Sequence, residues 1–126
     1  MSLKLITTET FNNLPCNDIE TWKDIKDYEG YYQISSFGNV RSLDRYIQQG
    51  NRTVMLKSKL LKPRYDSGKY LRVVLSKNAI EKGFSIHRLV AQHFIPNPNN
   101  LPEVNHKDEN KENNHVSNLE WCTSKY

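Results

Sequence analysis

A polar run rich in Asn, Asp and Lys occupies positions 105–118, between Val104 on one side and Leu119 on the other. The run carries too little apolar surface to fold alone, and Asn and Asp side chains favour turns. We therefore predict two short strands joined by a long, internally hydrogen-bonded loop. His106 follows Asn105 where the run begins. An imidazole can take up a proton near neutral pH, and an amide oxygen is a ligand for hard cations.

From Val104 to Trp121 the sequence reads VNHKDENKENNHVSNLEW. This block resembles the core of the HNH nucleases, the ββα-metal group, and especially the homing endonucleases encoded by phages and introns. Only Glu109 breaks the usual pattern, which has Gly at that position. The resemblance implies a metal-dependent DNA endonuclease, with Mg²⁺ as the expected ion and Mn²⁺ as the alternative.

The resemblance also implies roles for three residues. His106 matches the general base, Asn105 matches an oxygen ligand of the metal, and Asn118 matches an asparagine that ties the loop to the backbone of the histidine. Many relatives have Asp in place of Asn105, and a neutral amide holds Mg²⁺ less tightly than a carboxylate does. Consecutive strand residues point to opposite faces, so Asn105 and His106 require a distorted strand end to meet one phosphate. In the family, a further helix brings the last motif residue to the metal, and that position falls beyond Tyr126.

A second similarity lies upstream, over residues 20–43. Alternation over Tyr32–Ser35 predicts a strand, and Phe37-Gly38-Asn39 predicts a hairpin turn into Val40-Arg41-Ser42. The stretch is similar to a small module that often precedes the HNH block in homing endonucleases. That similarity implies a role in DNA binding.

Basic residues are concentrated in the middle of the chain. Residues 31–88 carry a net charge of +9, residues 1–30 carry −3 and residues 89–126 carry −2. A solvated surface could carry such charge, but a block this basic also suits a phosphate backbone, and we expect double-stranded DNA as the partner. The candidate DNA-binding residues are Arg41, Arg45, Arg52, Lys62, Arg64, Lys69 and Arg72.

The rest of the middle region reads as strands followed by one helix. Residues 44–58 hold few apolar side chains and predict an excursion or hairpin tip that could lie along a groove. Strands are predicted over Tyr70–Leu75 and Gly83–Ile86, joined through residues 76–82. Helical spacing of apolar residues predicts a short amphipathic helix over His87–Ile95. The histidine that opens this helix is assigned a capping or structural role.

These elements predict an α+β protein with three parts. Residues 1–19 form an N-terminal arm, residues 20–86 an antiparallel sheet module that binds DNA, and residues 87–126 the HNH block, whose last helix is largely missing from the chain. No apolar run approaches the ~20 residues of a membrane span, and no signal-peptide pattern is present. We therefore expect an intracellular protein, and favour a monomer.

Two other functions remain open at this level. The chain could be a catalytically weak or inactive DNA-binding protein that retains the HNH fold, as Asn105 and the shortened end favour. It could also be a basic protein-interaction domain with no nucleic-acid partner. Salt-dependent DNA binding would separate this last possibility from the other two.

Overall fold

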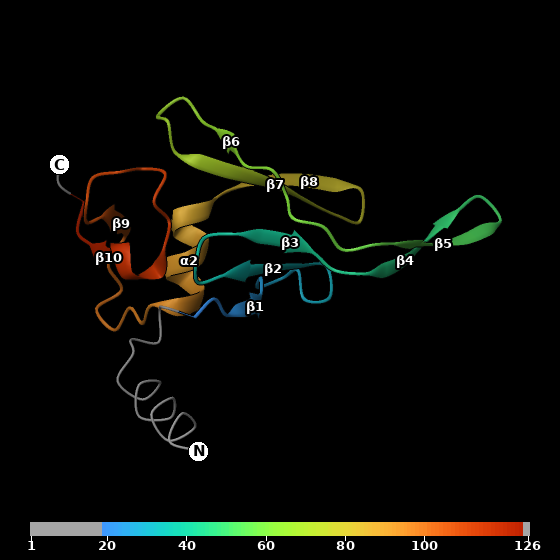
Figure 1. The fold of residues 1–126 in the computed structure, drawn as a ribbon, viewed down its shortest axis with the longest axis horizontal. Helices are drawn as coiled ribbons and strands as arrows, with labels where there is room; N and C mark the ends of the chain where they lie inside the picture. The colour runs from blue at the N-terminus through green and yellow to red at the C-terminus, as the bar shows by residue number, and fades with distance from the viewer. Residues whose placement is uncertain (1–18, 125–126) are drawn as a thin grey trace, which may run out of the picture.

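The computed structural model describes residues 19–124, in which small antiparallel sheets surround one helix (Figure 1). This arrangement confirms the predicted α+β class. The predicted arm, apart from Ile19, lies outside the described residues. The elements are β1 (Trp22–Asp24), β2 (Tyr32–Ser35), β3 (Val40–Ser42), β4 (Arg45–Gln49), β5 (Arg52–Leu56), β6 (Arg64–Tyr65), β7 (Leu71–Lys77), β8 (Ile80–Ser85), α2 (Ile86–Phe94), β9 (Glu103–His106), the 3₁₀ turn η2 (Val116–Asn118) and β10 (Leu119–Cys122).

The first sheet has the order β1-β2-β3, and its β2–β3 hairpin confirms the strand and turn predicted from the sequence. Gly38 adopts a φ of 87° in the turn, a conformation that glycine tolerates far better than other residues. The Ser35 hydroxyl accepts hydrogen bonds from the backbone N–H groups of Phe37 and Asn39. The turn is therefore held by its own side chain as well as by backbone bonds.

The predicted excursion over residues 44–58 is a two-stranded hairpin formed by β4 and β5. It extends away from the rest of the molecule (Figure 1). Tyr46 on this hairpin is 69% exposed. None of the buried core residues comes from β4 or β5.

The third sheet, β6-β7-β8, differs from the prediction in its turn. The expected connection over residues 76–82 is wrong, because strand pairing continues to Lys77 and resumes at Ile80. Only Asn78 and Ala79 remain in the turn, and both have positive φ values, 54° and 64°. A two-residue turn of this kind matches the right-handed twist of paired strands. The usual Asn-Gly signature is absent, so the sequence pattern missed it.

The hydrophobic core lies around α2 and draws on both halves of the chain. Val73 and Leu75 on β7 are buried, whereas Val74 between them is 48% exposed, as the two-residue period of a strand requires. The predicted helix is confirmed, with shifted ends, and it stops where Pro96 cannot continue it. No helix within residues 19–124 is long and apolar enough to cross a membrane.

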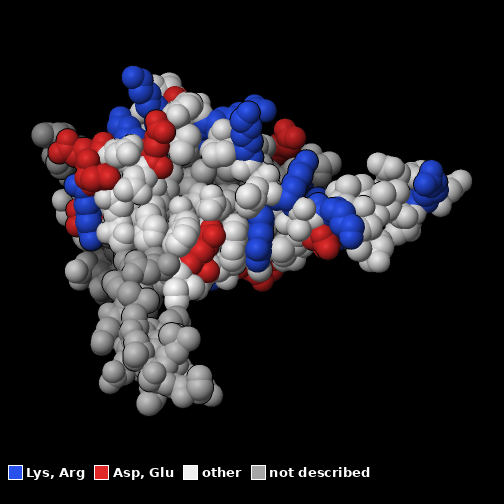
Figure 2. All heavy atoms as spheres, in the orientation of Figure 1, with Lys and Arg blue, Asp and Glu red and all other residues white. Residues whose placement is uncertain are grey.

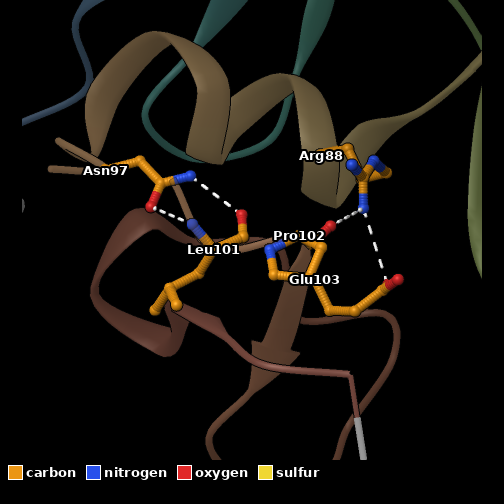
Figure 3. Close-up of polar contacts among 5 residues, drawn as sticks. All are labelled: Arg88, Asn97, Leu101, Pro102 and Glu103. Atoms are coloured by element: carbon orange, nitrogen blue, oxygen red, sulfur yellow. Dashed lines mark hydrogen bonds and ion pairs between the residues drawn. The ribbon is translucent and has the colours of Figure 1, made fainter. Parts of the chain in front are cut away.

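The segment between α2 and β9 is pinned by side-chain hydrogen bonds (Figure 3). Asn97 closes a turn by bonding both the N–H and the carbonyl of Leu101, at 2.8 and 2.9 Å. Arg88 on α2 donates to the carbonyl of Pro102 and lies 3.7 Å from the Glu103 carboxylate. The helix therefore fixes where β9 begins.

Candidate functional site

The polar run forms the predicted pair of strands with a long loop between them. β9 and β10 are antiparallel, with His106 opposite Leu119 and Asn105 opposite Glu120. Figure 1 shows this hairpin packed beside α2. The indole N–H of Trp121 donates to the carbonyl of Ile95 at 3.0 Å, which ties β10 to the end of the helix.

The loop is held together by amide and carboxylate side chains rather than by apolar contacts. Asn118 donates to Asp108 Oδ1 and to the carbonyl of Asn113, and its Oδ1 accepts from the Asp108 N–H. Hydrogen bonds from Asn113, the Asn110 N–H and Asn118 lower the pKa of the Asp108 carboxyl. The Asn118 side chain thus ties the loop to Asp108. The backbone carbonyl of Asn118 accepts from the N–H of Lys107, the residue after His106.

His106 is the last residue of β9 and is 5% exposed. Its Nε2 lies 2.8 Å from Oδ1 of Asn114, which is itself buried. An amide oxygen only accepts, so Nε2 carries the proton and Nδ1 is the basic nitrogen. Among the described residues, Nδ1 has no hydrogen-bond partner, and no fully buried side-chain N or O lacks one. Nδ1 therefore reaches solvent and is available to accept a proton.

Two aromatic rings complete the packing around His106. His87, on the first turn of α2, lies with its ring centroid 5.0 Å from that of His106, and Tyr70 stacks on His87 at 4.9 Å. Burial lowers the pKa of His87 from its ordinary value of 6.5 to about 4, and the nearby charges of His106 and Arg88 add to this effect. His87 therefore stays neutral at pH 7.

The depressed pKa of His87 predicts acid destabilisation. Since the unfolded state binds the proton more readily, stability is complete above about pH 6.5, falls as the pH drops towards 4, and levels off below it. Allowing for partial solvent screening, the loss is about 1–3 kcal/mol. Denaturant unfolding at pH 7 and pH 4.5 would measure it. The His87→Gln variant, which cannot titrate, should lose less stability over this interval, and an identical loss would contradict the assignment.

Asn105 and Glu120 form a polar pair on the outer side of the hairpin. The Asn105 amide N–H donates to Glu120 Oε2 at 2.8 Å. Both residues are exposed, whereas His106 is buried on the opposite face of β9. The expected distortion of the strand end is therefore wrong, because regular pairing with β10 continues through both positions. Within residues 19–124, no three His, Cys, Asp or Glu side chains form a group that could hold a metal.

Several of the predicted DNA-binding residues are brought together on the outer surface of β6 and β7. Two surface hollows of about 300 Å³ share Leu61 and Val74 in their lining, so they form one continuous surface. Arg64 faces Arg72 directly across the two strands, and directly opposed residues lie on the same side of a sheet. We call this surface the basic face. Its basic residues are Arg45, Lys57, Lys59, Lys62 and Arg64, which line the hollows, and Arg72, which is opposite Arg64; Glu81 is the acidic residue in the lining. Figure 2 shows Lys and Arg side chains along the upper side of the body and at the base of the β4–β5 hairpin.

The other candidates are not part of this surface. Arg41 is partly buried, with its guanidinium 4.0 Å from the Trp22 ring centre and two hydrogen bonds to Gln33 Oε1. Arg52 is exposed at the end of the β4–β5 hairpin, and Lys69 is exposed in the turn before Tyr70. These three positions stay predictions as DNA contacts.

Sequence reasoning missed two partners of the predicted site residues. Asn114 lies in the middle of the motif, and its pairing with His106 depends on how the loop folds back. Glu120 faces Asn105 because of the strand register, and a strand register could have pointed to it once the two strands were aligned.

Comparison with known proteins agrees with these observations. Residues 20–76 match the NUMOD4 motif, and residues 85–126 match the HNH endonuclease family. DNA endonuclease I-HmuI of Bacillus phage SP01 is 43% identical over 104 residues, which cover 82% of this chain and 53% of that protein. An uncharacterized HNH endonuclease of Acanthamoeba polyphaga mimivirus, L245, is 57% identical over 68 residues, covering 54% of this chain and 21% of L245.

A solved structure that describes DNA binding and cleavage by the HNH homing endonuclease I-HmuI matches with a TM-score of 0.64. The match has 43% sequence identity and covers 82% of this chain and 52% of that one. The chain thus spans about half the length of I-HmuI and a smaller share of L245. The chain therefore combines a match to the NUMOD4 motif with a match to the HNH endonuclease family, and it is homologous to the phage homing endonuclease I-HmuI.

Proposed function

We propose that the protein is a metal-dependent DNA endonuclease that hydrolyses phosphodiester bonds in double-stranded DNA with His106 as the general base. The observation that carries this proposal is the state of His106: Nε2 is tied to Asn114 and Nδ1 is free to accept a proton. Arg72 of the basic face is two residues along the chain from Tyr70. The centroid of the Tyr70 ring lies 5.9 Å from that of His106. Bound DNA would thus pass close to the base.

The proposed reaction needs one proton acceptor at the attacking water. Nδ1 of His106 takes a proton from the water as its oxygen bonds to phosphorus, and the bond from phosphorus to the 3′ oxygen breaks. The leaving 3′ oxygen takes up a proton from solvent water and His106 returns its proton to solvent, which yields 5′-phosphate and 3′-hydroxyl ends. Asn118 acts at a distance from the reacting atoms, because its hydrogen bonds hold the loop that follows His106.

The residues on the outer side of β9 fit a hard divalent cation. Because the Glu120 carboxylate only accepts hydrogen bonds, it holds the Asn105 amide with its N–H group towards Glu120, and Oδ1 has no hydrogen-bond partner among the described residues. An amide oxygen and a carboxylate side by side are ligands that Mg²⁺ and Mn²⁺ favour. A bound cation would supply positive charge to offset the negative charge of the scissile phosphate and the leaving oxygen. Because Asn105 and His106 lie on opposite faces of β9, the end of this strand would have to twist on DNA binding for the cation and His106 to act on one phosphate. Asn105 and Glu120 would hold it at the end of β9.

The proposal is tested by incubating supercoiled plasmid with the protein and Mg²⁺ or Mn²⁺, with an EDTA control. Nicked or linear product that requires the cation supports the endonuclease. DNA binding without cleavage would instead support a binding protein that retains the HNH fold, a function that the basic face favours because it does not depend on His106.

The Asn105→Asp variant should make the stability of the fold depend on divalent cations. A carboxylate at this position would lie directly opposite Glu120, and like charges in this arrangement repel. We expect a lower Tm than wild type in EDTA and a larger Tm increase on adding Mg²⁺ at constant ionic strength. Glu120→Gln combined with Asn105→Asp is the control and should lose most of this dependence. Equal Mg²⁺ shifts in wild type and Asn105→Asp would argue against this pair as the cation site.

A further inference from the structure

The turn between β2 and β3 directly contacts the long loop between β9 and β10. The Val116 N–H donates to the carbonyl of Ser36 at 2.8 Å. The ring of Phe37 stacks on that of His115, with centroids 4.8 Å apart and an angle of 29°. We call Ser36-Phe37-Gly38 the module turn, because it belongs to the segment that matches the NUMOD4 motif.

Gly38 of the module turn packs closely against Asn114 of the loop. A Cβ atom on Gly38 would lie 2.8 Å from the Asn114 Cβ and 3.0 Å from its carbonyl oxygen. Such distances are too short for nonbonded carbon and oxygen atoms, so the glycine is needed for space as well as for its φ of 87°. Gly30 has nearly the same φ, 84°, yet a Cβ there would meet nothing within 4 Å.

The module turn is the stiffer side of this contact. Ser35 is fully buried and Ser36 is 3% exposed. The Ser35 hydroxyl accepts two backbone N–H groups across the turn, and the Ser36 hydroxyl accepts the Thr21 N–H at 3.0 Å. A bulkier residue at position 38 would therefore displace Asn114 rather than the turn. Asn114 holds Nε2 of His106, so the displacement would reach the proposed base.

We propose that the module turn is a positioning element for His106, with Gly38 acting through Asn114. The inference rests on the proposed role of His106 as the general base. It gives the N-terminal module a part in assembling the site, in addition to the DNA binding inferred for that module. Gly38 is a positioning residue, because it would act on the imidazole through Asn114.

The first test observes the imidazole itself, without DNA or metal. Nitrogen NMR of the histidine rings reports which nitrogen of His106 carries the proton. In Gly38→Ala the His106 signals should move towards a mixture of tautomers, whereas in Gly30→Ala, which carries the same backbone strain without the clash, they should match wild type. Unchanged signals in both variants, or the same change in both, would overturn the proposal. This readout does not require the protein to cleave DNA.

The second test separates rate from binding. Gly38→Ala should lower the single-turnover nicking rate on the order of ten- to a hundred-fold, since small misplacements of a catalytic group have effects of this size. The DNA dissociation constant should change less than two-fold. In an Asn114→Ala background the same substitution should cause no further loss, because the hydrogen bond it disturbs is already gone. Additive losses would overturn the proposed route.

A third variant tests the proposal in case Gly38→Ala does not fold. Phe37 is 36% exposed, so Phe37→Ala should leave the core intact while removing the stack on His115. If Gly38→Ala does not fold, altered His106 signals in Phe37→Ala would support the proposal and unaltered signals would overturn it. If wild type does not nick DNA at all, the endonuclease proposal fails, and the NMR comparison still decides whether the turn positions the ring.

Discussion

Replacing His106 with alanine is expected to lower the plasmid-nicking rate by roughly 10²–10⁴-fold, the usual contribution of a positioned general base. DNA affinity should stay within about two-fold of wild type, because a proton acceptor stabilises the transition state more than the bound substrate. The measurements are single-turnover nicking and a gel-shift titration on the same DNA. His106 is 5% exposed, so circular dichroism should first establish that the variant is folded.

His93→Gln is a matched control for this experiment. In contrast to His106, His93 has both ring nitrogens near hydrogen-bond partners, with Nδ1 2.7 Å from the Leu89 carbonyl and Nε2 accepting the Lys26 N–H. These contacts are structural, and the control should keep cleaving. If His106→Ala weakened binding as much as cleavage, or if His93→Gln abolished cleavage equally, the assignment of His106 as the base would fail.

The double substitution Arg64→Ala with Arg72→Ala is expected to cause the largest loss of DNA affinity. Arg64 and Arg72 are direct partners in the register of β6 and β7, and neither forms an ion pair with a carboxylate within residues 19–124. Opposed like charges are unfavourable in the free protein and would be relieved by a phosphate. We expect binding to weaken on the order of ten- to a thousand-fold at low salt. The slope of log K against log salt should fall by roughly 2, since each phosphate contact contributes about 0.9.

A charge-matched control is the pair Lys23→Ala and Lys26→Ala. These lysines lie beside the end of α2, where Lys23 bonds the His93 carbonyl, and outside the basic face. The control also removes two positive charges. Because these lysines lie outside the basic face, it should change the slope of log K against log salt little. Equal effects of both double substitutions would mean that net charge, rather than the basic face, attracts the DNA.

The sequence predicted the elements whose pattern is local. Alternation marked β2, β-branched and aromatic content marked β7, helical spacing marked α2, and the polar run marked the β9–β10 hairpin. Contacts that depend on how distant segments meet were not predictable. The Asn114–His106 bond requires a loop fold that no periodicity encodes, and the trapping of Arg41 between Trp22 and Gln33 requires a known sheet register.

The contacts that each site residue makes could be learned only from the structure. The similarity to HNH nucleases predicted His106, Asn105 and Asn118, yet it could not show that Asn105 faces Glu120. It also gave no reason to link Gly38 with the loop, because a turn glycine is already explained by its positive φ. Only the close packing of Gly38 against Asn114 reveals the second requirement.

The β4–β5 hairpin can change in sequence or length without disturbing the hydrophobic core. Its five-residue strands reach about 17 Å from the body, at roughly 3.3 Å per residue, and add nothing buried to the core. Insertions or replacements there carry little penalty in folding and leave β9, β10 and the module turn untouched. Under the proposed function, changes in this hairpin would alter how much DNA the protein contacts without altering the residues around His106.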